Sequence, residues 1–480
     1  MKKILKNYYA YILLLLMITV ATVAVGYMHS LFADEREHLY ATYMISLGNV
    51  PYLDFFEHHH PLMWYLFAPI LNFFGDTVSI WYILRTFMLL GLLVTAVYVY
   101  HIIRLLTENI ELGLIGVAWF LGNNVVAWAG TEYRPDNLMV MFHTMGLYYL
   151  LKYLKQKTLS SLQISVMCFF LSLLALQKVV VLWVPLGVVV LYFLIKGEIK
   201  WKSLCVVMIF PCLYAAVLLI KMYQLGMLED YWILNWLLNG NALDKWEPPL
   251  ILWILPFVAS VCGGVQLWQK QSDVYIKSFA FMFLVTAPLL LVVLPVLKIS
   301  YLYSQYFLPI YPLMAVVLTV SLKPFLKYKK IVKITIFCVI AYYGTALYRT
   351  MNRTEQFGIP MAEYLDGILY EHSKPTDEIL CNIDLGTIGA MRRCAQGYFF
   401  FSYGMKAAEY SYRYNRKILP RLNEIIKSRM PKIVANNHWP DCGWNAENQK
   451  VVCRDAGQLM DIEWMKKHYT YNGFIWIRSY

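Results

Sequence analysis

Long apolar runs separated by short charged clusters constrain this chain more than any other feature. A helix needs about 20 apolar residues to cross a bilayer, and roughly the first 350 residues supply such runs repeatedly. Charged residues make up only 15% of the 480-residue chain, against about 25% in soluble globular proteins. The sequence therefore predicts an α-helical polytopic membrane protein.

About eleven spans are expected. They lie near residues 11–31, 78–103, 112–129, 137–153, 160–176, 179–195, 203–221, 250–268, 276–297, 305–322 and 331–350. The first run follows a basic start, as a signal peptide does, but it is longer than the usual apolar core of about 7–15 residues. This length favours an uncleaved membrane anchor.

The net charge of +12 raises the question of a nucleic-acid partner. The basic residues instead flank the apolar runs, mostly in the connections near 104–111, 152–159, 196–202, 269–277 and 323–330. Cytoplasmic loops carry an excess of Lys and Arg, so these connections and the N-terminus are expected in the cytoplasm. The excess of basic residues therefore indicates how the chain is oriented in the membrane. Membrane lipids are expected as partners, and nucleic acid is not.

The chain is expected to divide near residue 350. Residues 1–350 form the membrane body, with a long outside loop at 32–75 and another near 222–249. In residues 351–480 polar residues become frequent, and helix-like stretches (361–372, 419–427) alternate with strand-like ones (378–383, 432–435, 474–477). An odd number of spans places this small α/β soluble domain outside the cytoplasm. Four cysteines lie in it, Cys381, Cys394, Cys442 and Cys453. An oxidising compartment permits one or two disulfides, with Cys442 and Cys453 as the first pair to test, and free buried thiols are the alternative.

Ionisable residues follow the first span directly, in the sequence Ala33-Asp34-Glu35-Arg36-Glu37-His38. Tyr40, Met44 and Leu47 repeat at helical spacing, which predicts a short amphipathic helix along the membrane interface that ends near Gly48. Asp34 with Glu37 three positions later fits a capping box. A capping role and a catalytic role for Asp34 are compatible, because a cap at the bilayer surface also fixes a carboxylate in space.

Three consecutive histidines, His58, His59 and His60, follow Glu57 in the same loop. Neighbouring residues point in different directions on a helix or a strand, so at most two of the three can share one metal ion on a regular backbone. Three roles stay open for them: ligation of a divalent cation with Glu57, hydrogen bonding to phosphate or sugar, and a structural role.

Further polar residues are expected at the same membrane face. Asp136 follows Arg134-Pro135 in a short turn, where it can cap the next helix, and Lys178 interrupts two short spans. Tyr306 lies near an outside turn where tyrosines commonly form an interfacial belt. Because Asp34, Glu57 and Asp136 are all expected on one side of the bilayer, we predict that they share a polar pocket.

Together these residues resemble the C-type glycosyltransferase (GT-C) superfamily, in particular its branch of protein O-mannosyltransferases and lipid A aminoarabinose transferases. The resemblance rests on Asp34-Glu35, on Gly48 to Trp64 with Phe56-Glu57 and Pro61-Leu62, on Arg134-Pro135-Asp136, and on Tyr306 with Pro309 and Pro312. It covers the membrane body. One departure stands out: the aminoarabinose branch tends to have a basic residue and two prolines after the loop Glu, where this chain has His58-His59-His60-Pro61.

The resemblance implies a polyprenyl-phosphate sugar donor and a glycan, lipid or protein acceptor in the cell envelope, with lipopolysaccharide as one candidate. It further implies Asp34 as catalytic base with Glu35 in support, and Asp136 and Glu57 near the acceptor or a metal. Lys178 and Tyr306 would lie near the donor phosphate. The expected location is a bacterial inner membrane.

The residue types suit this chemistry. A carboxylate can take the proton of an attacking hydroxyl, the sugar gains oxocarbenium character, and Arg134, Lys178 or the histidines can stabilise the departing phosphate. Direct displacement would invert the anomeric centre. A polytopic transporter or lipid flippase is the alternative, although the polar groups gather at one face and no internal repeat is evident. A receptor or scaffold leaves the acidic first loop unexplained.

Overall fold

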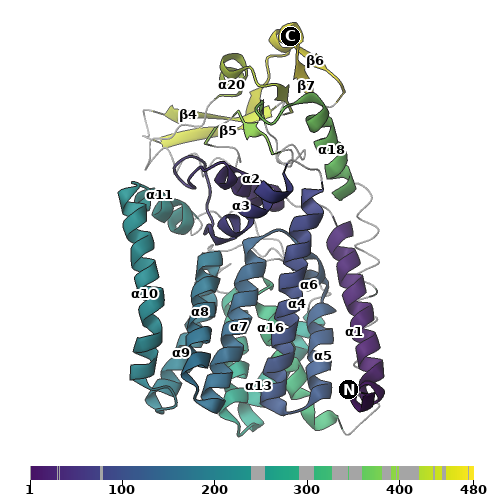
Figure 1. Cartoon of the computed structure of the whole chain (residues 1–480), viewed down its shortest axis with the longest axis vertical. Helices are drawn as coiled ribbons and strands as arrows, with labels where there is room; N and C mark the ends of the chain where they lie inside the picture. The colour runs from purple at the N-terminus through teal and green to yellow at the C-terminus, as the bar shows by residue number, and fades with distance from the viewer. Residues whose placement is uncertain are drawn as a thin grey trace. The chain divides into compact units, whose positions relative to one another are not determined.

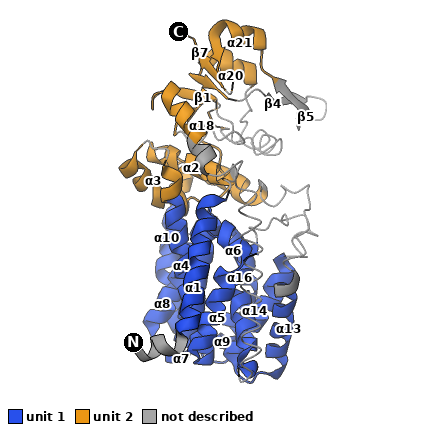
Figure 2. Cartoon of the chain, turned by 90° about the vertical axis from the view of Figure 1, so that its right-hand side faces the viewer, with its two compact units in different colours: residues 1–29, 84–219, 243–355 blue, residues 30–83, 220–242, 356–480 orange. Residues whose placement is uncertain are grey.

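The structure is a computed structural model of the whole chain. It describes all residues except 1, 30, 32, 76–78, 239–253, 291–306, 327–343, 345–358, 381–390, 396, 399–420, 436–437, 446–449, 474 and 480. Only the backbone is described for 2–8, 33, 238, 254–256, 359–363, 365, 438–445 and 450–458. The chain forms two compact units, shown in blue and orange in Figure 2. Unit 1 comprises residues 1–29, 84–219 and 243–355, and unit 2 comprises 30–83, 220–242 and 356–480.

Unit 1 is helical throughout the part that the structure describes. Its helices are α1 (Lys2–Met28), α4 (Ile80–Thr107), α5 (Ile110–Leu121), α6 (Asn124–Ala129), α7 (Pro135–Gln156), α8 (Leu159–Ala175), α9 (Val180–Ile195), α10 (Trp201–Gln224), α13 (Ile254–Lys270), α14 (Val274–Pro288) and α16 (Ile310–Ser321). Short 3-10 turns lie at Gln177–Val179 (η1) and Lys323–Phe325 (η6). In Figure 1 α4, α5, α7 and α8 run alongside one another.

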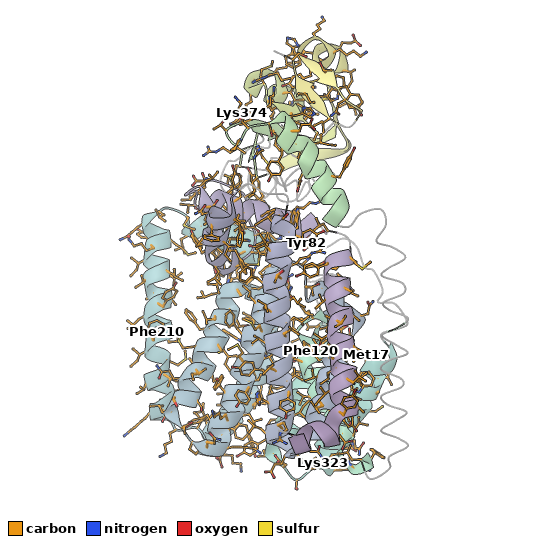
Figure 3. All side chains as sticks on the ribbon, turned by 45° about the vertical axis from the view of Figure 1, so that its right-hand side comes forward. Met17, Tyr82, Phe120, Phe210, Lys323 and Lys374 are labelled. Atoms are coloured by element: carbon orange, nitrogen blue, oxygen red, sulfur yellow. The ribbon has the colours of Figure 1, made fainter. Side chains whose placement is uncertain are left out.

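Four helical stretches of the described chain are long and apolar enough to cross a membrane: Tyr9–Met28, Ile80–Thr107, Gln177–Ile195 and Trp201–Gln224. Apolar side chains cover their outer faces. Met17 on α1 and Phe210 on α10 are 58% and 57% exposed, whereas Phe120 on α5 is 1% exposed and lies among the helices (Figure 3). Water would make such exposure costly, so these faces suit a lipid environment.

Ten of the expected spans coincide in whole or in part with described helices, with one correction. The single span expected over 112–129 is two helices, α5 and α6, because the chain breaks at Gly122 and the Asn123 side chain accepts a hydrogen bond from Val125 N to cap α6. Twelve residues of α5 rise only about 18 Å, too little to cross a bilayer alone. The span expected over 331–350 lies outside the described residues, and the count of eleven stays a prediction.

Unit 2 contains the first loop, a second stretch and the C-terminal segment. The loop carries α2 (Ala33–Ser46) and α3 (Leu62–Phe74), which pack together (Figure 1); sequence reasoning did not foresee α3. The second stretch has α11 (Leu228–Trp232), which continues as a π-helix, Ile233–Leu238 (η2). The C-terminal segment supplies α18 (Ile359–His372), α20 (Leu422–Arg429) and α21 (Ile462–His468).

A five-stranded mixed sheet lies in the C-terminal segment, in the order β2-β1-β3-β7-β6. Its strands are β1 (Glu378–Leu380), β2 (Arg393–Cys394), β3 (Ile433–Val434), β6 (Tyr469–Tyr471) and β7 (Trp476–Arg478). β1 pairs in parallel with β2 and β3, and β7 pairs antiparallel with β3 and β6. A separate antiparallel pair joins β4 (His438–Asn445) to β5 (Lys450–Leu459). The described part of this segment contains both helices and strands, and the small α/β soluble domain expected for residues 351–480 stays a prediction.

The hydrophobic core of unit 2 is built from all of its stretches. Tyr52 and Phe56 of the first loop pack with Leu234 of the π-helix and with Leu422 and Val434 of the C-terminal segment. The first loop therefore folds together with residues more than 300 positions later in the chain. The proposed division at residue 350 stays a prediction for the soluble part.

Disulfides were expected only in the C-terminal segment. Cys394 is disulfide-bonded, whereas Cys168 is a buried free thiol. The β4–β5 register sets Cys442 opposite Cys453, but their side chains lie outside the description, so the pairing predicted for them stays a prediction.

Candidate active site

Helix α2 carries the first acidic residues. It begins at Ala33, so Asp34 lies inside the first turn and not at the cap, and Glu37 faces His58 at 3.4 Å. The predicted capping box is therefore wrong. The helix is also not amphipathic: Glu35, Arg36, Glu37 and His38 are buried as well as Tyr40. Glu37 and His38 face His58 and His59 of the loop and Trp64 of α3, and the Tyr40 hydroxyl accepts a hydrogen bond from Cys394 N of the C-terminal segment. Asp34 alone among these residues is partly exposed.

The chain after α2 is held by hydrogen bonds at both ends of a tight loop. Gly48 ends the helix with a positive φ of 86°, as predicted. The Tyr52 hydroxyl donates to the His59 carbonyl at 2.6 Å. Phe56 N donates to the Tyr398 carbonyl at 2.8 Å, and the Tyr398 hydroxyl donates to the Tyr52 carbonyl at 2.9 Å. The backbone that carries Glu57 and His58 is thus fixed from two sides.

Glu37, Glu57, His58 and His59 form a buried acid–histidine cluster. One ligand atom from each lies within 4.8 Å of those of the others. Glu57 Oε1 accepts from His58 N at 2.8 Å and lies 2.9 Å from His59 Nδ1. Glu57 Oε2 is buried without a hydrogen-bond partner among the described residues. The loop here is neither helix nor strand, which allows two adjacent histidines to face the same carboxylates.

The cluster has an unusual charge balance. Burial raises the pKa of the Glu57 carboxyl well above its usual value, and the nearby Glu37 charge adds to that rise. Burial also raises the pKa of Glu37, an effect that the neighbouring His58 opposes. Two carboxyls this close cannot both ionise without a compensating positive charge. Protons or a cation must therefore neutralise the cluster.

This balance predicts a pH-dependent stability for the cation-free protein. The pKa of Glu57 is raised above its usual 4.5, so folded Glu57 keeps a proton that the unfolded chain has lost. The free energy of unfolding should therefore fall as pH rises from about 4.5 until Glu57 ionises in the folded state. Glu57→Gln should flatten this slope and be the more stable protein at neutral pH. Unfolding in detergent with a chelator present measures the effect, and an unchanged slope would contradict it.

The third histidine points elsewhere. His60 Nε2 lies 2.8 Å from the Tyr231 hydroxyl, and the two rings are stacked. Two of the three histidines therefore belong to the cluster, on a loop whose irregular backbone lies outside the limit predicted for helices and strands. Glu37 joined the site unforeseen; its position three residues after Asp34, on one helix face, was the available signal.

The donor set of the cluster fits a divalent cation. Two carboxylates and two imidazoles are ligands that zinc accepts in four-coordinate sites, and manganese also takes such mixed sets. The partnerless Glu57 Oε2 offers one oxygen, and the excess negative charge of the ionised acids would be balanced by the ion. The residues present therefore could hold a metal.

A second acidic group lies in unit 1, in the turn after α6. Arg134 Nε is 3.5 Å from Asp136 Oδ2 and 3.9 Å from Glu132 Oε2, and all three side chains are buried. Arg134 itself is the N-cap residue of α7, with Pro135 at its first position. The predicted capping role of Asp136 is therefore wrong: the helix starts one residue earlier, and the Asp136 carboxylate faces the Arg134 guanidinium.

Removal of the Arg134 charge should destabilise unit 1 strongly. Arg134→Ala leaves two buried carboxylates without their cation, which costs about 3–5 kcal/mol in comparable cases. Arg134→Lys keeps the charge and should cost less, although it loses the planar fork. Unfolding by SDS in mixed micelles measures both, with Arg104→Ala at the partly exposed end of α4 as control. Equal stability of Arg134→Ala and this control would contradict the expectation.

The remaining predicted residues have separate positions. Lys178 lies in η1 between α8 and α9, partly buried, and Tyr306 lies outside the described residues. Asp34, Glu57 and the three histidines belong to unit 2, whereas Arg134, Asp136 and Lys178 belong to unit 1. The structure brings Glu57 together with His58 and His59, and Arg134 together with Asp136; a pocket shared by both groups stays a prediction.

The comparison with solved structures decides the fold. No protein-family model and no curated protein sequence matches the chain. ArnT from Cupriavidus metallidurans bound to undecaprenyl phosphate is similar in structure, with a TM-score of 0.62 and 12% sequence identity over 89% of this chain and 93% of that chain. The chain has a fold similar to that of ArnT.

Other structures complete this comparison. ArnT from the same organism in the apo state gives a TM-score of 0.60 and 11% identity, with the same coverage. An oligosaccharyltransferase from Archaeoglobus fulgidus, in complex with zinc and sulfate, gives only 0.44 and 11% identity over 88% of this chain and 67% of that chain. The predicted resemblance to the GT-C superfamily is thus confirmed at the level of the fold.

Proposed function

We propose that the chain is an integral-membrane glycosyltransferase that moves a sugar from a polyprenyl-phosphate carrier to an envelope glycan, lipid or protein. The observation that carries this proposal is the fold likeness to ArnT bound to undecaprenyl phosphate, which extends over 89% of the chain. An apolar carrier explains why the enzyme would be built from apolar helices. The acid–histidine cluster supplies the polar chemistry that such a transfer requires.

Asp34 is the proposed catalytic base. It is the partly exposed carboxylate at the start of α2, whereas its acidic neighbours Glu35 and Glu37 are buried. An acceptor hydroxyl becomes acidic as it attacks, and a carboxylate within reach can take its proton. Glu35 would support this role by holding the first turn in place.

The reaction proposed is a direct displacement. The acceptor oxygen forms a bond to the anomeric carbon while the bond to the carrier phosphate breaks, and the acceptor proton passes to Asp34. Attack from the opposite face inverts the anomeric centre. The sugar passes through an oxocarbenium-like state, as in glycoside hydrolysis. The product phosphate leaves as an anion attached to the polyprenyl chain.

Positive groups would stabilise that leaving anion. Arg134 and Lys178 are the proposed contacts in unit 1, with Asp136 holding the Arg134 guanidinium at 3.5 Å. Tyr306 is a further proposed donor-side neighbour. In unit 2 the histidines 58–60 are the proposed polar contacts for phosphate or sugar. A divalent cation held by Glu37, Glu57, His58 and His59 would add electrostatic stabilisation of the phosphate.

The proposed location is a bacterial inner membrane. The N-terminus would lie in the cytoplasm, and residues 351–480 would lie outside it, in accord with the basic connections on the cytoplasmic side. Reporter fusions at Asp34 and Asp136 would test this arrangement, since both must lie on the same outer side.

Transfer in detergent tests the function directly. In detergent, where there is no membrane to cross, purified protein should transfer sugar from a labelled polyprenyl-phosphate donor to acceptors in a cell-envelope extract. A flippase or transporter would show no transfer in this assay. Absence of transfer with donors of several sugars would overturn the proposal.

A further inference from the structure

An aromatic group in the second stretch of unit 2 adjoins the first loop. It consists of Tyr231 and Trp232 of α11 and Trp236 of the π-helix, together with His60; we call it the aromatic platform. The Trp232 and Trp236 rings are stacked with centroids 6.1 Å apart, and the His60 and Trp236 rings meet edge to face at 6.0 Å. None of these rings belongs to the acid–histidine cluster.

Hydrogen bonds hold the inner rings in place. The Tyr231 hydroxyl lies 2.8 Å from His60 Nε2, and Trp236 Nε1 donates to the same hydroxyl at 3.4 Å. Tyr52 packs edge to face on Tyr231 at 5.7 Å. The wound π-helix, a form often found at functional sites, sets Trp236 beside Trp232. The protein therefore holds the inner side of the aromatic platform in a fixed position.

The outer face of the platform is open. Trp232 is 55% exposed, although its partners are half-buried or buried. A large exposed indole held beside fixed polar groups is a costly surface unless something covers it. His60 follows His59 directly in the chain, so the covering group would lie close to the acid–histidine cluster.

Charge indicates what the covering group is. Residues 225–238 contain Glu229 and Asp230 and no Lys or Arg. Of the two acids only Glu229 is exposed, because Asp230 is buried. This stretch therefore offers a phosphate no Lys or Arg and one exposed carboxylate, which disfavours the carrier end of the donor and anionic lipid headgroups. A sugar ring instead offers an apolar C–H face for stacking and hydroxyls for the Tyr231 and His60 groups, the combination of apolar walls and few polar contacts typical of ligand sites.

We propose that the aromatic platform binds a neutral saccharide ring of the acceptor, with Trp232 stacked against it. This inference rests on the proposed function and adds the acceptor subsite to it. The platform holds the acceptor sugar by stacking and so contributes to binding in the ground state and the transition state alike.

Trp232→Ala tests the platform by kinetics. Loss of uniform binding raises KM and leaves kcat unchanged, so the acceptor KM should rise about tenfold while kcat and the donor KM stay within about twofold. Trp201→Ala is the matched control, because Trp201 is a 67% exposed tryptophan at the start of α10. Equal acceptor KM values for the two variants would overturn the proposal.

A binding measurement separates this proposal from the proposed function. The probe is the water-soluble oligosaccharide released from the source cells' envelope by mild acid, titrated by calorimetry into full-length protein that carries Asp34→Asn. Adding Trp232→Ala should weaken its binding about tenfold, and adding Trp201→Ala should not. Lack of transfer by the wild type counts against the function, whereas equal binding by both variants, or none by either, counts against the platform.

A lipid probe tests the alternative that the exposed Trp232 lies at the membrane interface. Interfacial tryptophans contact lipid headgroups. In nanodiscs of brominated phosphatidylcholine, the bromine atoms quench the fluorescence of tryptophans that contact lipid. The contribution of Trp232 is the difference between the wild type and Trp232→Phe, and its quenching should decrease when the oligosaccharide is added. Strong quenching of Trp232 that the oligosaccharide leaves unchanged would assign this residue to the membrane interface and overturn the proposal.

Discussion

Asp34→Asn is expected to abolish sugar transfer in a protein that still folds. General-base groups contribute about 10²–10⁴ in rate, so kcat should fall by at least about 100-fold. The substitution is nearly isosteric, and Asp34 is partly exposed, so the unfolding transition should hardly move. The measurement is single-turnover transfer from a labelled polyprenyl-phosphate donor in detergent, together with a thermal unfolding curve.

Asp54→Asn provides a matched control for this result. Asp54 is an exposed carboxylate of the same loop, whose Oδ2 accepts from Val50 N at 2.6 Å. An amide oxygen can accept the same bond, so activity should be retained. Wild-type transfer by Asp34→Asn would remove this residue from catalysis and return attention to the buried acids.

Glu57→Gln is expected to abolish cation binding. The substitution replaces a carboxylate that contacts both cluster histidines with a neutral amide, and affinity should fall by roughly 100-fold or more, since even outer-shell changes cost about 10–100-fold. Chelator-treated protein titrated with Zn²⁺ or Mn²⁺, with metal content read by mass spectrometry, measures this. Sugar transfer should fall by about 10²–10³ in parallel, the size of a lost electrostatic contact in other enzymes.

His60→Gln separates the cluster from its neighbour in this experiment. His60 faces Tyr231 rather than the acids, so this variant should bind the cation as the wild type does. Affinity should also rise with pH, because the ligands must lose protons to bind. A Glu57→Gln protein that binds the cation with full affinity would exclude the cluster as the metal site.

Sequence reasoning succeeded where the signal was periodic or local. The apolar runs identified the positions of most helices, and Gly48 marked the end of α2. Glu57, His58 and His59, which the sequence singled out, lie together in the acid–histidine cluster; their role stays a prediction. The resemblance then indicated the fold that the comparison with ArnT confirmed.

It failed where distant packing decides the outcome. The polar side of α2 was expected in water, yet Glu37 and His38 are buried because later segments cover them. Glu37 was therefore assigned to a cap and not to the acid–histidine cluster. Asp136 was also assigned to a cap, but here the cause is local: α7 starts one residue earlier, and the Arg134 guanidinium faces the Asp136 carboxylate. Apolar residues 62–74 were assigned to the first outside loop, whereas they form α3.

Tyr398 is joined to the first loop through Tyr52 and Phe56, and all three rings lie in or against a single core. The tail of the chain is therefore not an accessory that can be cut away or exchanged with that of a distant relative. Exchanging the C-terminal segment would replace the residues that hold the first loop in its conformation. Substitutions in the first loop and in the C-terminal segment should therefore covary. A working chimera would need both segments from the same parent protein.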